Sequence, residues 1–396
     1  MWTKDVQLST RVRVCKVEPS SCCRGVCRAA ARDEIEVPSS LDTTSIGSNN
    51  SCTTNMPESF GQSSSSSSSS TTDLATDRRP PQGGCDGVVC LLGCLMAVPG
   101  VKKRIVNSVA FFPPCPPGYY LSDTGKALLC SRSSSPFPEP IPDLSTALGI
   151  TVETVTLHTV VGNELRAFHF KKTAAGGAGG DHAKVAGSSS SSSLARKGKT
   201  IIFSHGNSTD IGLMFPHLRD IAAKCDVSVL AYDYSGYGCS TGEPSERNLY
   251  ADIQAAFLYL NEECNIPMSQ IILYGQSVGS APSIHLANEL QHGLGGLILH
   301  SALKSGLAVV YSKIQHSPWY DVFQNVHKIK EVDAPVFLIH GTADLEVPID
   351  HGKALYEACL RPFPPWWVHE GGHNDIEVIW RATFFTKIRG FLDSLE

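Results

Sequence analysis

Residues 271–280 read IILYGQSVGS. The apolar run that opens this stretch predicts a short buried strand of a parallel sheet. It leads directly into G-x-S-x-G, the pattern of a nucleophile elbow, in which a tight strand-to-helix turn exposes one serine above the sheet edge. Gly275 and Gly279 suit such a turn because a Cβ at either position would clash with neighbouring backbone. The residues that follow have helical composition with Pro282 in the first turn, so we predict that Ser277 is a nucleophile.

The elbow strand belongs to a series of short apolar runs that alternate with helical patterns. Further strands are expected at Thr200–Ser204, Val227–Tyr232, Gly295–His300, Val336–His340 and Pro365–His369, with helices at Gly212–Lys224, Ser245–Glu263, Asp350–Leu360 and Asp375–Leu395. Upstream, Thr151–His158 and Leu165–Lys171 predict a hairpin across Gly162-Asn163. This order predicts an α/β-hydrolase fold, with a mostly parallel central sheet and helices on both faces.

That fold places the partners of the nucleophile in the chain order Ser, Asp or Glu, His. Asp344 follows the strand that ends at His340, and His373 lies in a glycine-rich loop after the last short strand. We therefore predict that His373 takes the proton of Ser277 and that Asp344 orients the imidazole.

Four neighbouring residues are weaker candidates for the same roles. His369 falls inside the last predicted strand and His351 at the start of a helix. Glu346 and Asp350 lie further along than Asp344, where capping of the following helix is their ordinary use.

An oxyanion hole needs two backbone N–H groups directed at the developing negative charge. Val278 follows the nucleophile and is expected to supply one, and Asn207, at the end of an earlier strand, the other. Since backbone groups do this, the identity of the side chain at both positions is only weakly informative. His205 is expected to have a structural role in the loop that contains Asn207.

Composition narrows the class of protein. The chain has 396 residues, 42% hydrophobic and 18% charged, and a formal net charge of −5, which suits a soluble globular core and gives no indication of nucleic-acid binding. The sequence holds no set of metal ligands and no dinucleotide-binding loop, so we expect neither a metal nor a cofactor. Of its 14 cysteines only four follow residue 200, and in so large a chain we expect free thiols in a reducing compartment. No secretory signal and no run of about 20 apolar residues is apparent.

The first part of the chain differs from the rest. Residues 1–84 are rich in serine and are expected to form a disordered N-terminal extension. Residues 85–120 comprise a cysteine-rich apolar segment and a connector rich in proline and aromatic residues, and 145–396 are expected to form the catalytic domain, with a Gly/Ser-rich surface insertion at 174–193.

The cysteine-rich segment is predicted to be a membrane anchor. Its apolar run, residues 87–98, is too short to cross a bilayer but long enough to lie in the interface. The three cysteines Cys85, Cys90 and Cys94 are candidates for S-acylation, and the basic residues Lys102, Lys103 and Arg104 follow. A buried helix with incidental cysteines is the alternative, and a lipidated cluster at Cys22, Cys23 and Cys27 is a further possibility.

Taken together, six stretches resemble one family, the α/β-hydrolase domain-containing 17 proteins. They are residues 204–207, 233–238, 244–252, 273–279, 340–344 and 372–376. The resemblance implies a membrane-bound serine hydrolase that removes palmitate from S-acylated proteins. By this likeness Ser277, Asp344 and His373 match the catalytic triad, and Cys85, Cys90 and Cys94 match the acylated anchor.

The resemblance thus predicts a palmitoyl-protein thioesterase that acts through an acyl-enzyme. Its expected partners are S-palmitoylated proteins and a membrane surface, with no nucleic acid, and its expected place is the cytoplasmic face of plasma and endosomal membranes. Two alternatives remain: a lipase or esterase acting on glycerolipid oxygen esters, and a non-catalytic membrane scaffold with a hydrolase fold.

Overall fold

The computed structural model describes residues 93–98, 100–130, 138–172, 198–311 and 317–395. The predicted disordered extension, Cys85, Cys90, the alternative cluster at residues 22–27 and the insertion at 174–193 lie outside these ranges and stay predictions.

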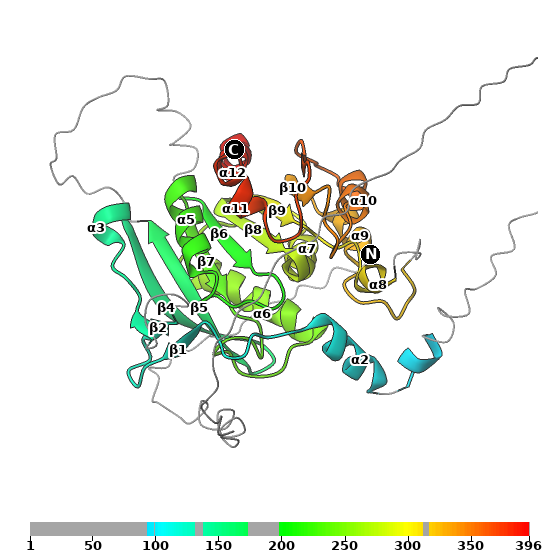
Figure 1. Ribbon diagram of the computed structural model, residues 1–396, viewed down its shortest axis with the longest axis horizontal. Helices are drawn as coiled ribbons and strands as arrows, with labels where there is room; N and C mark the ends of the chain where they lie inside the picture. The colour runs from blue at the N-terminus through cyan, green and yellow to red at the C-terminus, as the bar shows by residue number, and fades with distance from the viewer. Residues whose placement is uncertain (1–92, 99, 131–137, 173–197, 312–316, 396) are drawn as a thin grey trace, which may run out of the picture. The chain divides into compact units, whose positions relative to one another are not determined.

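An eight-stranded sheet forms the centre of the catalytic domain (Figure 1). Its strands, in spatial order, are β11 Trp366–Val368, β10 Val336–Gly341, β9 Gly296–His300, β8 Ile271–Gln276, β6 Thr200–Ser204, β7 Ser228–Tyr232, β5 Glu164–Lys172 and β4 Ile150–His158. The strands from β11 to β7 pair in parallel, whereas β5 pairs antiparallel with both β7 and β4. The mostly parallel sheet and the β4–β5 hairpin are as the sequence predicted.

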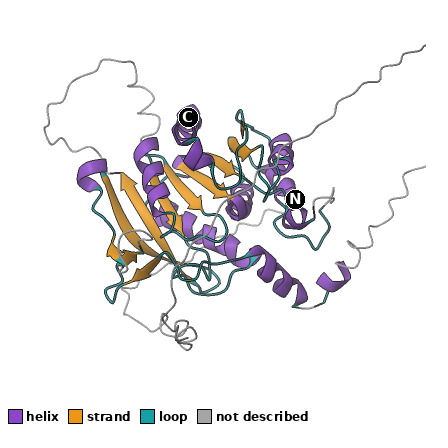
Figure 2. Ribbon diagram, viewed as in Figure 1, coloured by secondary structure: helices purple, strands orange, loops and turns teal. Residues whose placement is uncertain are grey.

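Helices cover both faces of this sheet (Figure 2). The main ones are α5 Phe215–Cys225, α6 Glu246–Leu258, α7 Ser280–Leu290, α10 Asp350–Ala358 and α12 Arg381–Ser394, with shorter helices at α3 Ser145–Leu148, α8 Gly306–Val310, α9 Asn325–Lys328 and α11 Ile376–Ile379. Residues of α6, α7 and α10 belong to one buried hydrophobic cluster, and residues of α5 and α12 to a second. The α/β-hydrolase fold is confirmed.

Several elements differ from the prediction. The single helix expected over Asp375–Leu395 is two helices, because the backbone of Trp380 leaves helical geometry between α11 and α12. The helix expected to reach Glu263 ends as α-helix at Leu258 and continues as one π-helical turn. Its start is as predicted, since the Ser245 side chain accepts from the N–H of Asn248 at 3.2 Å.

A small antiparallel sheet upstream of the domain was not foreseen. It comprises β1 Tyr119–Leu121, β2 Ala127–Leu129 and β3 Glu139–Pro140. Strands of two or three residues are too short to show an alternating pattern. The sequence marks the turn between β1 and β2 only by Gly125, whose φ of +75° favours glycine.

Helix α2, Val101–Ala110, precedes this sheet and includes the predicted basic triplet. Val106 is buried in the cluster that also contains residues of α6 and α7. Phe111, just after the helix, is 4% exposed and packs edge-on against Phe323 with ring centroids 6.1 Å apart. The segment is therefore part of the folded unit. In the described part of the chain no helix is long and apolar enough to cross a membrane.

Candidate active site

The nucleophile elbow is formed as expected. Strand β8 is buried along its whole length and ends immediately before Ser277, whose φ of +52° is unusual for a residue with a side chain. A Cβ on Gly275 would lie 2.5 Å from the carbonyl oxygen of Gly279, and one on Gly279 would overlap the carbonyl oxygen of Ser204. The structure thus confirms the predicted reason for both glycines.

The three predicted catalytic side chains lie within hydrogen-bonding distance of one another. Nε2 of His373 is 2.9 Å from Oγ of Ser277, and Nδ1 of His373 is 2.7 Å from Oδ2 of Asp344. An ionised carboxylate can only accept, so Nδ1 carries the proton and Nε2 is free to accept the serine hydrogen. This arrangement can activate a serine for attack on a carbonyl carbon.

The charge of Asp344 is stabilised by its surroundings. Its Oδ1 accepts from the N–H groups of Glu346 at 3.0 Å and Val347 at 2.8 Å, and its Oδ2 lies 3.3 Å from Nε2 of His340. Burial alone would raise the pKa of Asp344, but the bonds from His340 and His373 outweigh it and hold the pKa well below its usual range. Asp344 therefore stays ionised at neutral pH.

The carboxylate of Asp344 in turn changes the pKa of the His373 imidazole. Burial would lower the pKa of His373, but the hydrogen bond and charge of Asp344, helped by Glu346, raise it above the ordinary 6.5.

The base must be neutral to accept a proton, so kcat/KM should rise with pH and reach half its maximum above pH 6.5. A pH profile of ester hydrolysis checks this, and an inflection at or below that value would contradict it. Glu346→Gln, which removes one neighbouring charge, should move the inflection to lower pH.

The two predicted oxyanion donors lie beside the nucleophile. Val278 is in the first turn of the helix that follows Ser277, where N–H groups have no partner within the helix. A Cβ on Gly206, next to Asn207, would lie 3.8 Å from Cβ of Ser277, so this loop adjoins the nucleophile.

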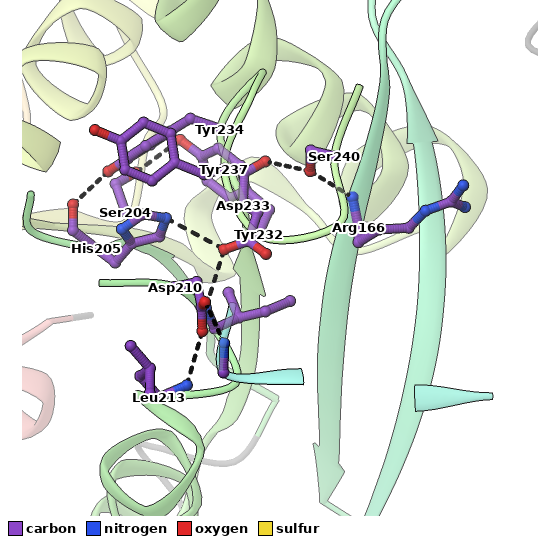
Figure 3. Close-up of polar contacts among 12 residues, drawn as sticks. Arg166, Ser204, His205, Asp210, Leu213, Tyr232, Asp233, Tyr234, Tyr237 and Ser240 are labelled. Atoms are coloured by element: carbon purple, nitrogen blue, oxygen red, sulfur yellow. Dashed lines mark hydrogen bonds and ion pairs between the residues drawn. The ribbon is translucent and has the colours of Figure 1, made fainter. Parts of the chain in front are cut away.

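A buried polar network holds this loop in place (Figure 3). Nε2 of His205 lies 3.4 Å from Oδ1 of Asp233, and the other oxygen of that carboxylate accepts from the Tyr119 hydroxyl at 2.6 Å. Nδ1 of His205 is 2.8 Å from the carbonyl oxygen of Gly206, and the Tyr234 hydroxyl donates to the carbonyl of His205. The expected structural role of His205 agrees with these contacts.

The side chain of Asn207 has a role that the sequence did not reveal. Its Nδ2 donates to the carbonyl oxygen of Ala110 at 3.0 Å, which satisfies an acceptor left open at the end of helix α2. Its Oδ1 accepts from the N–H of Phe112 at 2.9 Å and from the Tyr237 hydroxyl at 2.7 Å. This side chain therefore joins the N-terminal segment to the oxyanion loop.

Replacing Asn207 with alanine should lower kcat for a short-chain ester by about ten- to a hundredfold, since a loop displaced by a fraction of an ångström misplaces its N–H group. Tyr237→Phe removes the hydroxyl that bonds Asn207 and the Phe112 N–H but keeps the Asn207 side chain on Ala110 and Phe112, so it should have a smaller effect. Steady-state kinetics with circular dichroism as a check of folding would measure both. A folded Asn207→Ala protein with normal kcat would exclude the positioning role.

The weaker candidates lie away from the reaction centre or assist it. The His369 side chain is 88% exposed, and Nδ1 of His351 accepts from the N–H of Lys304 at 3.2 Å. No side chain caps helix α10, so the capping expected of Glu346 and Asp350 was wrong. Glu346 instead accepts from Asn374 at 2.9 Å, with Oε2 3.9 Å from Nε2 of His373.

An apolar pocket of about 280 Å³ opens onto the nucleophile. Ser277, Val278 and His373 line it together with Asn207, and most of the remaining lining is aliphatic or aromatic. Three of those residues come from the N-terminal segment, namely Met96, Val106 and Ala110. The others come from later in the chain and are Leu303, Gly306, Leu307, Val309, Val310, Tyr320, Val322, Phe323 and Val347. Asp321 and Glu346 are the acidic members. Such a volume is at the small end for ligand sites and suits an apolar group such as part of an acyl chain.

Of the predicted lipidation sites, Cys94 is described, and it is an exposed free thiol. The other described cysteines are also thiols outside any disulfide, as predicted. Over the same ranges, no group of three potential metal ligands comes together.

Comparison with known proteins gives three kinds of match. The family model described as serine aminopeptidase, S33, matches residues 195–328. The α/β hydrolase domain-containing protein aho-3 of Caenorhabditis elegans is 35% identical over 320 residues, which are 79% of this chain and 86% of that protein. The α/β hydrolase domain-containing protein 17B of Homo sapiens is 34% identical over 292 residues, 72% of this chain and 91% of that protein. Among solved structures, the esterase Pf2001 of Pyrococcus furiosus gives a TM-score of 0.49 at 16% identity, over 64% of this chain and 96% of that one.

Proposed function

This chain belongs to the α/β-hydrolase domain-containing 17 family and is a hydrolase of the serine type, and from that premise we propose that it removes palmitate from S-acylated proteins at membranes. The observation that carries the proposal is the apolar pocket, which opens directly onto Ser277 and His373. A thioesterase for long-chain acyl groups needs an apolar site of this kind beside its nucleophile.

The reaction proceeds through an acyl-enzyme. Oγ of Ser277 attacks the thioester carbonyl carbon as its proton passes to Nε2 of His373, and the N–H groups of Val278 and Asn207 stabilise the oxyanion. The carbon–sulfur bond then breaks, and the protein thiol leaves with the proton from His373. Water deprotonated by His373 attacks the acyl-serine, which releases the fatty acid and restores Ser277.

The hydrogen bonds between Ser277, His373 and Asp344 disfavour a non-catalytic scaffold. A glycerolipid lipase would use the same triad and the same pocket, so the substrate must be tested directly. A palmitoylated peptide should be cleaved far faster than a triglyceride emulsion or a short-chain ester by the full chain. Comparable turnover of triglyceride would instead identify a lipase. Labelling of Ser277 by a fluorophosphonate probe, absent in Ser277→Ala, shows in either case that the nucleophile works.

The second part of the proposal concerns localisation: the enzyme is held on the cytoplasmic face of plasma and endosomal membranes. One acyl chain gives marginal, reversible binding, so Cys85, Cys90 and Cys94 would be acylated together. The basic residues Lys102, Lys103 and Arg104 would add about 1 kcal/mol each near an anionic surface.

Replacing Cys85, Cys90 and Cys94 with serine should therefore release the enzyme to the cytosol without loss of activity on a soluble ester. Cys115→Ser, which changes an exposed thiol outside the cluster, is the matched control and should stay on membranes. Cell fractionation measures both. If the triple variant stays bound, Cys22, Cys23 and Cys27 are the next candidates, and binding by a variant lacking all six would exclude acylation as the anchor.

A further inference from the structure

One wall of the pocket comes from outside the expected catalytic domain. Met96, Val106 and Ala110, which we call the N-terminal wall, line the same cavity as Ser277. Val106 is 7% exposed, so its side chain is held by packing. The end of α2 is fixed as well, because Asn207 bonds both the Ala110 carbonyl and the Phe112 N–H.

The Ala110 end of the N-terminal wall is tied to the loop that adjoins the nucleophile. Ala110 is hydrogen-bonded through its carbonyl to Asn207, whose own N–H is the candidate oxyanion donor. Val106 lies four residues earlier on the same face of α2, about 6 Å further along the helix axis. A chain attached to Ser277 would thus pass Ala110 before it passes Val106.

We propose that the N-terminal wall determines the length of acyl chain that the enzyme accepts, with Ala110 limiting shorter chains and Val106 longer ones. This rests on the proposed function only in that the pocket receives the acyl group. The walls of a close-packed apolar pocket discriminate by size, because an added methylene must either fill free space or displace a side chain.

The experiment compares acetyl, butyryl, octanoyl and palmitoyl thioesters as substrates of the full-length enzyme. Measured against the acetyl turnover of the same variant, Ala110→Leu should lower kcat/KM by at least about tenfold beyond a short chain length. Val106→Phe should also lower kcat/KM by at least about tenfold, but only for acyl chains longer than those that Ala110→Leu already excludes. Val160→Phe adds similar bulk at an exposed position in the β4–β5 turn and should leave the profile unchanged. Val106→Ala cannot obstruct the pocket and should favour the longest chains.

Normal fluorophosphonate labelling of Ser277 separates a blocked pocket from a misfolded protein. If labelled variants keep the wild-type profile, or if Ala110→Leu and Val106→Phe fail at the same chain length, the assignment is overturned. Should a bulky variant not fold, an unchanged profile in Val106→Ala would overturn it equally. The proposed function is contradicted by a different result, a wild-type enzyme that does not prefer palmitoyl thioesters. In that case the dependence of kcat/KM on acyl-chain length can still be measured with oxygen esters.

Discussion

Ser277→Ala is expected to abolish hydrolysis, with kcat lowered by about 10⁶-fold and the fold intact. Among the residues that the structure describes, the Ser277 hydroxyl is the group placed to form the acyl-enzyme, since its Oγ lies 2.9 Å from Nε2 of the base His373. Loss of one oxygen atom leaves the packing of the elbow unchanged, so the melting temperature should stay near that of the wild type. Turnover of a palmitoyl thioester and thermal unfolding measure the two expectations.

The other two members of the triad complete this test. His373→Ala should cost as much as Ser277→Ala, and Asp344→Asn about 10⁴-fold, because it leaves the imidazole in the wrong tautomer. Combining the substitutions should add little, since the three residues act as a unit. Near-normal turnover by His373→Ala would refute the assignment, and exposed His369 would be tested next.

Gly279→Ala should have the largest effect on folding. The new Cβ would overlap the carbonyl oxygen of Ser204 and lie 2.8 Å from that of His205, and both are backbone atoms that cannot rotate away. We expect the free energy of unfolding to fall by about 3 kcal/mol or more and the melting temperature by about 5 °C or more.

Gly390→Ala is the matched control for this substitution. Gly390 lies within α12, and no described atom outside its own stretch of helix lies within 4 Å of the position that its Cβ would occupy. Alanine there should be neutral or stabilise the protein by up to about 1 kcal/mol, because it restricts the unfolded chain and favours helix. If Gly279→Ala unfolds at the temperature of Gly390→Ala, the close approach of the elbow to strand β6 is not what requires glycine.

The parallel part of the fold could be predicted because each buried strand is a continuous apolar run. Strands β6, β8 and β10 have nearly the predicted limits, since each contains three or four consecutive apolar residues bounded by turn signals. The elbow then identified the fold, and the fold supplied the chain order of Asp344 and His373. The meeting of the three side chains follows from topology, which a local motif can reveal.

Other features depend on contacts that have no local pattern. Asn207 bonds groups 95 and 97 residues away that belong to the backbone, and backbone groups leave no mark on the sequence. The break at Trp380 is similar, because no glycine or proline occurs between Ile376 and Phe384. Both of those residues are fully buried, and their tertiary packing prevails over helix propensity.

The packing of Phe111 and Val106 bears on how this protein can be shortened. A truncation placed at the start of the predicted catalytic domain, near residue 145, would remove the buried side chains of Val106, Phe111 and Tyr119, among others, and leave Phe323 without its aromatic partner. The truncation would also expose the apolar lining of the pocket to water, so the shortened protein would tend to aggregate. The shortest form suitable for expression and crystallisation should therefore begin before Gly93.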